Sequence, residues 1–185
     1  MLLFESPEQW ETWLKENHAV LPGVQLKFAK KGTGQKSVTY AEALEVALCY
    51  GWIDGQSKAL DDTFYLQRFT PRRRRSVWSK INTEKAEALI AQGRMQPAGL
   101  KEIEAAKQDG RWAAAYDSPS RAVVPDDFQA ELEKNPKAKA FFATLNSPNR
   151  YAICYRIQTA RKPETRRARI EKFIAMLNEN QKIYP

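Results

Sequence analysis

The chain has 185 residues, of which 43% are hydrophobic, and a formal net charge of +8. This length suits one compact domain with its own core. No stretch approaches the roughly 18 to 20 apolar residues that cross a bilayer, and the first residues, MLLFESPEQWETW, contain no basic segment followed by an apolar run, so we expect a soluble, cytoplasmic protein without a membrane span.

The N-terminal segment predicts a helix followed by a strand. Ser6 and Pro7 are typical of a helix start, with Ser6 as the cap and Gln9 completing a capping box. Apolar and polar residues alternate over residues 24–29. This period of two indicates a half-buried strand.

A second helix is predicted after the glycine-containing turn. Thr39 is followed three residues later by Glu42, which is the spacing of a capping box. An apolar stripe then continues to Gly51, a natural helix stop. We therefore expect a helix from about 40 to 50.

Two extended segments follow this helix. Residues 52–58 and 63–70 are rich in aromatic and β-forming residues and are separated by a polar turn, which suggests a hairpin ended by Pro71. The strand at 24–29 adds a third member, because an isolated hairpin is only marginally stable.

Beyond the hairpin the pattern is helical. Asn82 or Thr83 caps the next helix, and further apolar stripes at helical spacing continue to the end of the chain. We predict an α+β fold, a predominantly helical single domain over 1–185 with a small antiparallel three-stranded sheet. Within it, residues 1–120 form an α+β lobe and residues 121–185 form an all-helical C-terminal lobe.

The positive charge is concentrated in two windows. Residues 68–80 contain six basic residues and no acid, and residues 150–172 contain eight basic residues against two acids. Each window carries a net charge of +6, so the rest of the chain is net negative. The basic excess is therefore local.

The residues most often used in catalysis are scarce. The one histidine, His18, lies near the expected end of the first helix, and Cys49 and Cys154 stand alone. Gly32 and Gly34 match neither a P-loop nor a dinucleotide fingerprint. We predict no catalytic residue, no cofactor and no metal site.

Several motifs resemble those of a known family. They are GWIDG (51–55), RFTPRR (68–73), SVWSKIN (76–82), GRM (93–95), AKQDGRW (106–112) and TARKPETRRARI (159–170). In this order they resemble the bacteriocin-protection, YdeI/OmpD-associated family of bacterial proteins, over about residues 39–178. The resemblance implies a link with resistance to bacteriocins and cationic antimicrobial peptides. A protein of net charge +8 repels such peptides at long range, so direct capture of the peptide is not expected.

Asp54 and Arg68 are two charged residues on the predicted strands of the hairpin. Asp54 follows Trp52 closely and is either a turn-forming residue or an acid that pairs with arginine or acts as a base. Arg68 shares a strand face with Phe64 and Leu66. It is expected either to pair with Asp54 across the hairpin or to reach into a pocket for an anion.

The arginine run after the hairpin has two interpretations. Arg72, Arg73, Arg74 and Arg75 follow a proline and are expected to be exposed, either as a solvated loop or as a site for phosphate or carboxylate groups. Trp78 either stacks on a ligand or anchors the loop against the core.

The C-terminal window contains a helix start at Pro163. Glu164 lies in the first turn, three residues before Arg167, and Arg166 shares the inward stripe with Ile170. We predict a helix junction held by a charge pair, with an anion site at the helix start as the alternative.

The resulting hypothesis is a non-catalytic stress or antimicrobial-resistance protein that binds an anionic partner, with nucleic acid as the candidate. The expected ligand-binding residues are Trp52, Asp54, Lys58, Arg68, Arg72, Arg73, Arg74, Arg75, Trp78, Ser79 and Asn82. Ser79 and Asn82 are alternatively helix caps.

Two other classes of function stay open. One is an enzyme that acts on a small anionic metabolite in a pocket lined by Trp52, Asp54, Arg68 and Trp78. The other is a protein-interaction module, which an exposed apolar patch favours.

Overall fold

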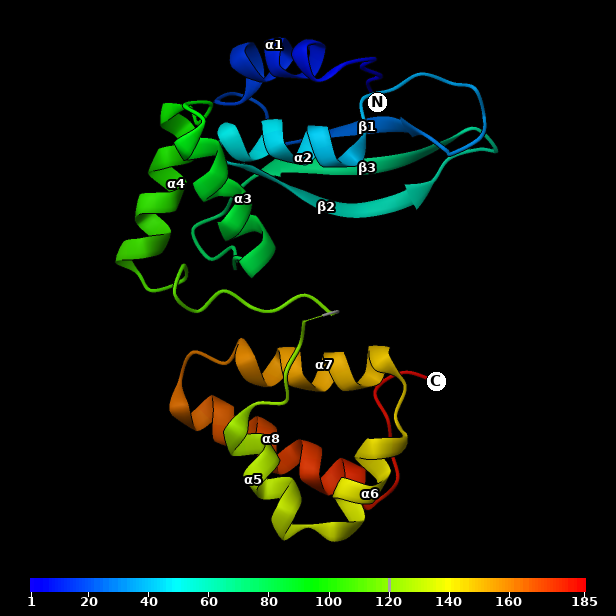
Figure 1. Ribbon diagram of the computed structural model, residues 1–185, viewed down its shortest axis with the longest axis vertical. Helices are drawn as coiled ribbons and strands as arrows, with labels where there is room; N and C mark the ends of the chain where they lie inside the picture. The colour runs from blue at the N-terminus through cyan, green and yellow to red at the C-terminus, as the bar shows by residue number, and fades with distance from the viewer. Residues whose placement is uncertain (120) are drawn as a thin grey trace. The chain divides into compact units, whose positions relative to one another are not determined.

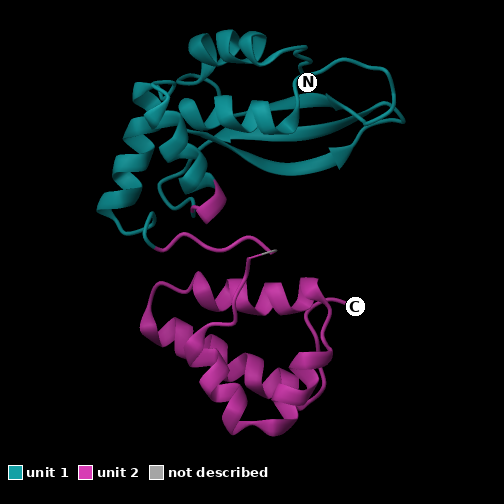
Figure 2. Cartoon of the chain, in the orientation of Figure 1, with its two compact units in different colours: residues 1–77, 82–113 teal, residues 78–81, 114–185 magenta. Residues whose placement is uncertain are grey.

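The computed structural model describes residues 1–119 and 121–185. Within them the chain forms two compact units, which are coloured separately in Figure 2. Unit 1 comprises residues 1–77 and 82–113, and unit 2 comprises residues 78–81 and 114–185.

Both units contain helices, and unit 1 also contains a sheet (Figure 1). In chain order the elements are α1 (Pro7–Asn17), β1 (Val24–Ala29), α2 (Tyr40–Cys49), β2 (Trp52–Ala59), β3 (Phe64–Pro71), α3 (Lys80–Ala91), α4 (Pro97–Gln108), α5 (Asp126–Lys134), α6 (Pro136–Thr144), α7 (Ser147–Gln158) and α8 (Pro163–Asn178). This arrangement confirms the predicted α+β fold. Among the described residues, no helix is long and apolar enough to cross a membrane.

The sheet is antiparallel, in the order β1–β3–β2, so β3 occupies the centre. The strands predicted at 24–29, 52–58 and 63–70 agree with the observed strands to within one residue at each end. Strand β1 pairs with β3 because the hairpin of β2 and β3 leaves one edge of β3 free.

The register of the sheet decides which side chains share a face. Phe28 of β1 lies opposite Tyr65 of β3, and Asp54 of β2 lies opposite Phe69. The register shifts between Asp54 and Ser57, which is a bulge in β2. The even-numbered residues of β3 therefore face away from the side that carries Asp54 and Phe69.

The two edges of the sheet differ. The N-terminal segment runs beside β1, where the Leu2 amide donates to the Gln25 carbonyl at 2.9 Å and the Leu2 carbonyl accepts from the Lys27 amide at 2.8 Å. The opposite edge is β2.

Helices α1 and α2 cover one face of the sheet (Figure 1). Trp10 of α1 is fully buried, with its ring 5.7 Å from the Phe69 ring and 6.4 Å from the Trp52 ring. Its Nε1 donates to the Ala43 carbonyl of α2 at 3.1 Å. One indole thus joins two helices to two strands.

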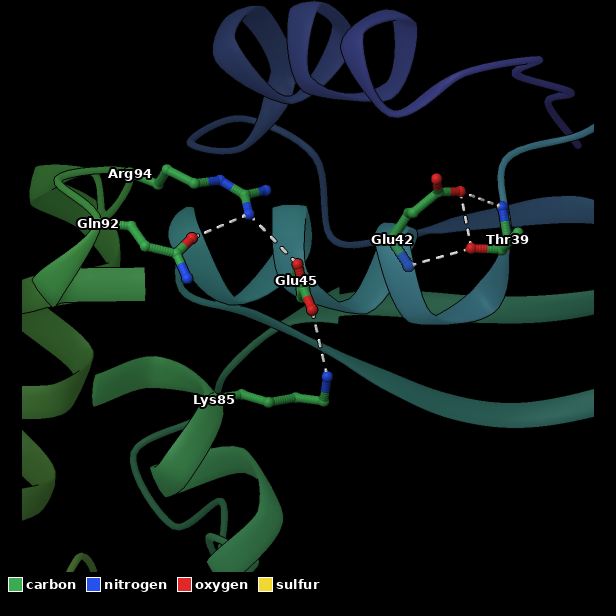
Figure 3. Close-up of polar contacts among 6 residues, drawn as sticks. All are labelled: Thr39, Glu42, Glu45, Lys85, Gln92 and Arg94. Carbon is green, nitrogen blue, oxygen red and sulfur yellow. Dashed lines mark hydrogen bonds and ion pairs between the residues drawn. The ribbon is translucent and has the colours of Figure 1, made fainter. Parts of the chain in front are cut away.

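The predicted capping residues Ser6 and Thr39 are present at α1 and α2, but the capping box forms only at α2. Ser6 Oγ accepts from the Gln9 amide at 3.5 Å, although the Gln9 side chain returns to the Glu5 amide at 2.9 Å and not to Ser6. At the second helix the complete capping box forms, since Thr39 and Glu42 each bond the main chain of the other (Figure 3).

Glu45 ties α2 to the segments that follow the sheet (Figure 3). One carboxylate oxygen lies 3.3 Å from Lys85 Nζ on α3, and the other lies 3.3 Å from Arg94 Nη1 in the loop before α4. The carboxylate is only a third exposed, so it is screened less than a surface group.

Helices α2 and α4 meet at a glycine. A Cβ placed on Gly99 would lie 2.4 Å from the Cys49 carbonyl oxygen and 2.8 Å from the Leu48 carbonyl oxygen. The two backbones therefore approach more closely than any other residue at position 99 permits.

Helix α3 begins at Lys80, two residues before the expected cap. The Tyr116 amide donates to the Trp78 carbonyl at 3.0 Å, and the Lys80 amide donates to the Tyr116 carbonyl at 2.9 Å. This short ladder around Ser79 fixes the main chain directly before the helix, so Asn82 lies inside the first turn.

Unit 2 packs α5, α6, α7 and α8 around a single apolar core. Its buried residues are Phe128, Leu132, Ala138, Phe142, Leu145, Ile153, Cys154, Ile157, Ile170, Phe173, Ile174 and Leu177. The stripe expected along α8 is thus confirmed as core.

Gly99→Ala tests the close approach of α2 and α4. The added methyl group must push the helices apart, so we expect the free energy of unfolding to fall by about 1 to 3 kcal/mol. Gly55→Ala is the matched control, because its Cβ would lie 3.7 Å from the nearest atom of Arg68, and a change below about 0.5 kcal/mol is expected there. Urea denaturation measures both, and equal losses would contradict the contact.

Candidate anion-binding loop

The arginine loop, residues 72–77, follows β3 directly. It is fixed at its start because the Arg72 amide donates to the Gly51 carbonyl at 2.9 Å. Next, the Ser76 amide donates to the Arg73 carbonyl at 2.7 Å, and Ser76 Oγ accepts from the Arg73 amide at 2.9 Å. These bonds close a β-turn over residues 73–76.

The four arginines of the loop divide into two groups. Arg73, Arg74 and Arg75 are exposed, whereas Arg72 is only 7% exposed and donates from Nη1 to the Val77 carbonyl at 3.2 Å. The prediction that all four are exposed is therefore wrong for Arg72. Its side chain reaches across the base of the turn to the far end of the loop.

A second buried arginine, in the segment directly after α4, supports the loop. Arg111 is 2% exposed, and its Nη1 donates to the Ser76 carbonyl at 3.0 Å. Its Nε lies 2.8 and 2.7 Å from the two carboxylate oxygens of Asp109. A buried guanidinium group needs a balancing charge and hydrogen-bond acceptors, and these two partners supply both.

The end of α4 directs Arg111 inward. Asp109 caps the helix, and Gly110 adopts a φ of +77°, a left-handed conformation that suits glycine. The Trp112 amide then bonds back to the Ala106 carbonyl at 3.0 Å. In the sequence, Arg111 is noticed only within the family-like motif AKQDGRW, and its role in supporting the loop is not predicted.

The loop therefore presents cations on a fixed main chain. The Ser76 carbonyl accepts from the buried Arg111, and the Val77 carbonyl accepts from the buried Arg72. The turn over residues 73–76 carries the three exposed arginines. Guanidinium groups form paired hydrogen bonds to phosphate and carboxylate. Such a turn can bind an anion without first being ordered.

The structure separates Asp54 from Arg68. Asp54 Oδ2 accepts from the Tyr40 hydroxyl at 2.8 Å, and Asp54 pairs with Phe69 in the register, so the two residues share one face of the sheet. Arg68 is exposed on the other face, opposite Gln25. The predicted pairing of Asp54 with Arg68 is wrong because the register places the two residues on opposite faces of the sheet.

The tryptophans of the candidate site are both buried. Trp52 is 1% exposed and donates from Nε1 to the His18 carbonyl at 3.1 Å, and Trp78 is 2% exposed. Trp52, Asp54 and Arg68 do not share one pocket, since Arg68 lies on the opposite face of the sheet.

Lys58 lies near Arg68 on the sheet face away from α1 and α2. Both residues are exposed, and Lys58 lies opposite Leu66 across β2 and β3. On the same face, Lys27 lies opposite Leu66 from β1, with its Nζ 5.9 Å from the centre of the Phe64 ring. This face is therefore basic with apolar residues between the cations.

In unit 2, two arginines of α8 bond the end of α7. Arg166 donates to the Ile157 carbonyl at 2.9 Å, and Arg169 donates to the Arg156 carbonyl. Cations at a helix C-terminus are favourable because they oppose the partial negative charge of the free carbonyls. The TRRARI part of the family-like motif thus holds a helix junction.

The charge pair at this junction differs from the predicted one. Arg166 donates from Nε and Nη2 to the two carboxylate oxygens of Asp127, at 2.5 and 2.8 Å. No ion pair of Glu164 occurs in the part of the chain that the structure describes. Asp127 lies 39 residues away in sequence, so local spacing could not indicate it.

The cysteines and the histidine lie in structural positions. Burial raises the pKa of Cys49 to about 11 and also raises the pKa of Cys154, so both remain thiols at neutral pH. His18 caps α1 and bonds the Leu14 carbonyl through Nδ1 at 2.9 Å. Among residues 1–119 and 121–185, no group of three or more His, Cys, Asp or Glu side chains could hold a metal ion.

Residues 2–102, more than half of the chain, match the family described as Domain of unknown function (DUF8412). The chain belongs to the DUF8412 family. In this DUF8412 protein, residues 121–180 also match the family described as Bacteriocin-protection, YdeI or OmpD-Associated. This match confirms the resemblance but is narrower than the expected range of 39–178, since the GWIDG and SVWSKIN segments lie in the DUF8412 match. No curated protein and no solved structure matches the chain.

Separate replacement of the buried arginine and of the three exposed arginines tests the division of the arginine loop. Arg72→Ser removes a buried side chain and its bond to Val77, so we expect the free energy of unfolding to fall by about 2 kcal/mol. Changing Arg73, Arg74 and Arg75 together to Ser is expected to cost less than about 1 kcal/mol. A triple variant as unstable as Arg72→Ser in urea denaturation would contradict this division.

The Asp127–Arg166 pair predicts a dependence of stability on pH. The hydrogen bond from Arg166 is the main cause that lowers the pKa of Asp127. A lowered folded-state pKa stabilises the fold above the unfolded value of about 3.9, and this contribution is lost as pH falls through the lowered pKa. Asp127→Asn should therefore be less stable than the parent at neutral pH, and the two should converge in acid.

Urea denaturation over a series of pH values measures this convergence. Asp126→Asn is the control, because Asp126 is the exposed neighbour and forms no ion pair in the described residues. A constant difference between the parent and Asp127→Asn down to acid pH would show that the carboxylate charge is unimportant.

Proposed function

We propose that the protein binds an anionic partner through the arginine loop, and that the partner is nucleic acid. The observation that carries this proposal is the division of the loop, in which two buried guanidinium groups hold a turn that exposes Arg73, Arg74 and Arg75. Phosphate oxygens are the ligands that such a cluster suits best.

The fixed turn is important for affinity. A flexible arginine segment loses conformational entropy when it binds, whereas the hydrogen bonds of Arg73 to Ser76 already fix the main chain here. Binding therefore has to order only the exposed side chains.

The basic face of the sheet extends the proposed surface. Lys27, Lys58 and Arg68 lie on the face away from α1 and α2, with Phe64 and Leu66 between them. β3 leads from this face directly into the loop. A nucleic-acid backbone that follows both would contact cations along its length.

The family matched by residues 121–180 suggests the biological setting. We place the protein in the protection of bacteria against bacteriocins or cationic antimicrobial peptides. Because its own net charge is +8, it would act on an anionic partner and not by capturing the peptide.

Nucleic-acid binding at a series of salt concentrations tests the proposal. We expect fluorescence anisotropy with labelled single-stranded and duplex DNA to give an affinity whose logarithm falls with log salt by several units, about 0.9 for each neutralised duplex phosphate. Changing Arg73, Arg74 and Arg75 to Gln should reduce this slope by about 2 to 3 units.

The control is the change of Lys15, Lys31 and Lys101 to Gln. These exposed lysines of unit 1 lie outside the loop and the basic sheet face, and their loss removes the same amount of charge. Equal weakening by both triple variants would reduce the effect to net charge and reject the loop as the site. No binding of either DNA at low salt would reject the proposal as a whole.

A further inference from the structure

A hollow of about 530 Å³ lies on unit 2, and no residue of the arginine loop lines it. It follows one face of α7 from Ser147 to Arg156, and Pro119 and Tyr184 line it from two other segments. The residues of α7 that line it recur at helical spacing, so this tyrosine hollow extends along the helix for about 13 Å. Its volume lies within the range of small-molecule sites.

Tyrosine rings form the walls of the tyrosine hollow. Tyr151 and Tyr155 lie one turn apart on α7, with ring centres 5.8 Å apart and planes inclined by 35°. The Tyr116 ring stands edge-on to the Tyr155 ring, with the ring centres 4.9 Å apart. This packing fixes the Tyr155 ring, so a flat apolar surface is present before any ligand arrives.

Tyr184 is held in place by a buried asparagine. Asn149 is 1% exposed, and its Oδ1 accepts from the amides of Ile183 and Tyr184, each at 2.9 Å. Its Nδ2 donates to the Tyr184 carbonyl at 3.3 Å. The main chain near the C-terminus is therefore held against α7, and this position brings the Tyr184 ring to the wall of the hollow.

Arg156 is the charged residue among those that line the tyrosine hollow. Its guanidinium group lies 5.9 Å from the centre of the Tyr184 ring and donates from Nη1 to the Ala152 carbonyl at 3.0 Å. No carboxylate lines the hollow in the part of the chain that the structure describes. The local field is therefore positive.

Asp117, whose main-chain carbonyl contacts Tyr151, has cationic and amide partners of its own. Asp117 is mostly buried, with one carboxylate oxygen 2.8 Å from Lys80 Nζ and the other 3.3 Å from Gln158 Nε2. The Tyr151 hydroxyl donates to the main-chain carbonyl of Asp117 at 3.2 Å. Burial is the main cause that raises the pKa of Tyr151 to about 12, so this wall stays neutral at physiological pH.

We infer that the tyrosine hollow binds a planar aromatic carboxylate. Fixed tyrosine rings offer surfaces on which an aromatic ring stacks, and Arg156 offers hydrogen-bond donors and a positive charge for the acid group. A neutral aromatic compound lacks the second interaction, and an aliphatic acid lacks the first. The inference concerns unit 2 alone and does not depend on the arginine loop.

Calorimetric titration with 1-naphthoate, and with 1-naphthalenemethanol as its neutral counterpart, tests the inference on the full chain. We expect naphthoate to bind at least about tenfold more tightly than the alcohol, as a charge-assisted hydrogen bond predicts. Arg156→Gln should weaken naphthoate by about tenfold and leave the alcohol unchanged.

Two further variants separate the site from general effects. Tyr184→Ala removes an exposed ring while keeping the main-chain bonds to Asn149, and should weaken both compounds by about threefold. Arg161→Gln removes an exposed arginine outside the tyrosine hollow and should change neither affinity.

Three outcomes would overturn the inference. They are an absence of naphthoate binding at millimolar concentration, equal affinity for the acid and the alcohol, and equal weakening by Arg156→Gln and Arg161→Gln. Thermal unfolding of each variant verifies its fold, and Tyr184→Ala keeps the test decisive if Arg156→Gln is unstable.

Discussion

The side chain of Arg111 is almost fully buried, and the arrangement of the loop beside it depends on how that buried charge is satisfied. Asp109 balances the charge, and the Ser76 carbonyl accepts one of the remaining donors. Arg72 bonds the next carbonyl of the same loop. Because a buried cation without partners is strongly unfavourable, these contacts allow the loop few alternative conformations. Three exposed arginines thus owe their position to two that solvent hardly reaches.

Arginine has a different task in unit 2. Arg166 and Arg169 bond the last carbonyls of α7 and so join α7 to α8, while Asp127 links the same junction to α5. Arg156 differs from these two arginines, because its guanidinium group lies over the Tyr184 ring and lines the tyrosine hollow. Net charge in a sequence window therefore overstates the charge available to a partner, since several of these cations are occupied within the fold.

Local signals predicted the elements well, and distant contacts account for the failures. Thr39 with Glu42 and the alternation over residues 24–29 act within one turn or one strand, so the sequence displays them directly. Arg111 and Ser76 are 35 residues apart, and no spacing rule connects them. A run of four arginines looks uniform in the sequence. In the structure the turn begins at Arg73, so Arg73 to Arg75 are exposed whereas Arg72 is buried. The tyrosine hollow likewise requires Tyr184 to return to α7, where the buried Asn149, 35 residues earlier, bonds the main chain of Tyr184.

The unequal edges of the sheet bear on how the protein resists self-association. An unpaired strand edge is a template for another chain, and here the N-terminal segment occupies the edge of β1. The other edge, β2, is interrupted by the bulge between Asp54 and Ser57 and carries the exposed Lys58 beyond it. A bulge breaks the regular row of donors and acceptors, and a lysine is costly to bury between strands. The hairpin can therefore expose a long strand without inviting edge-to-edge aggregation.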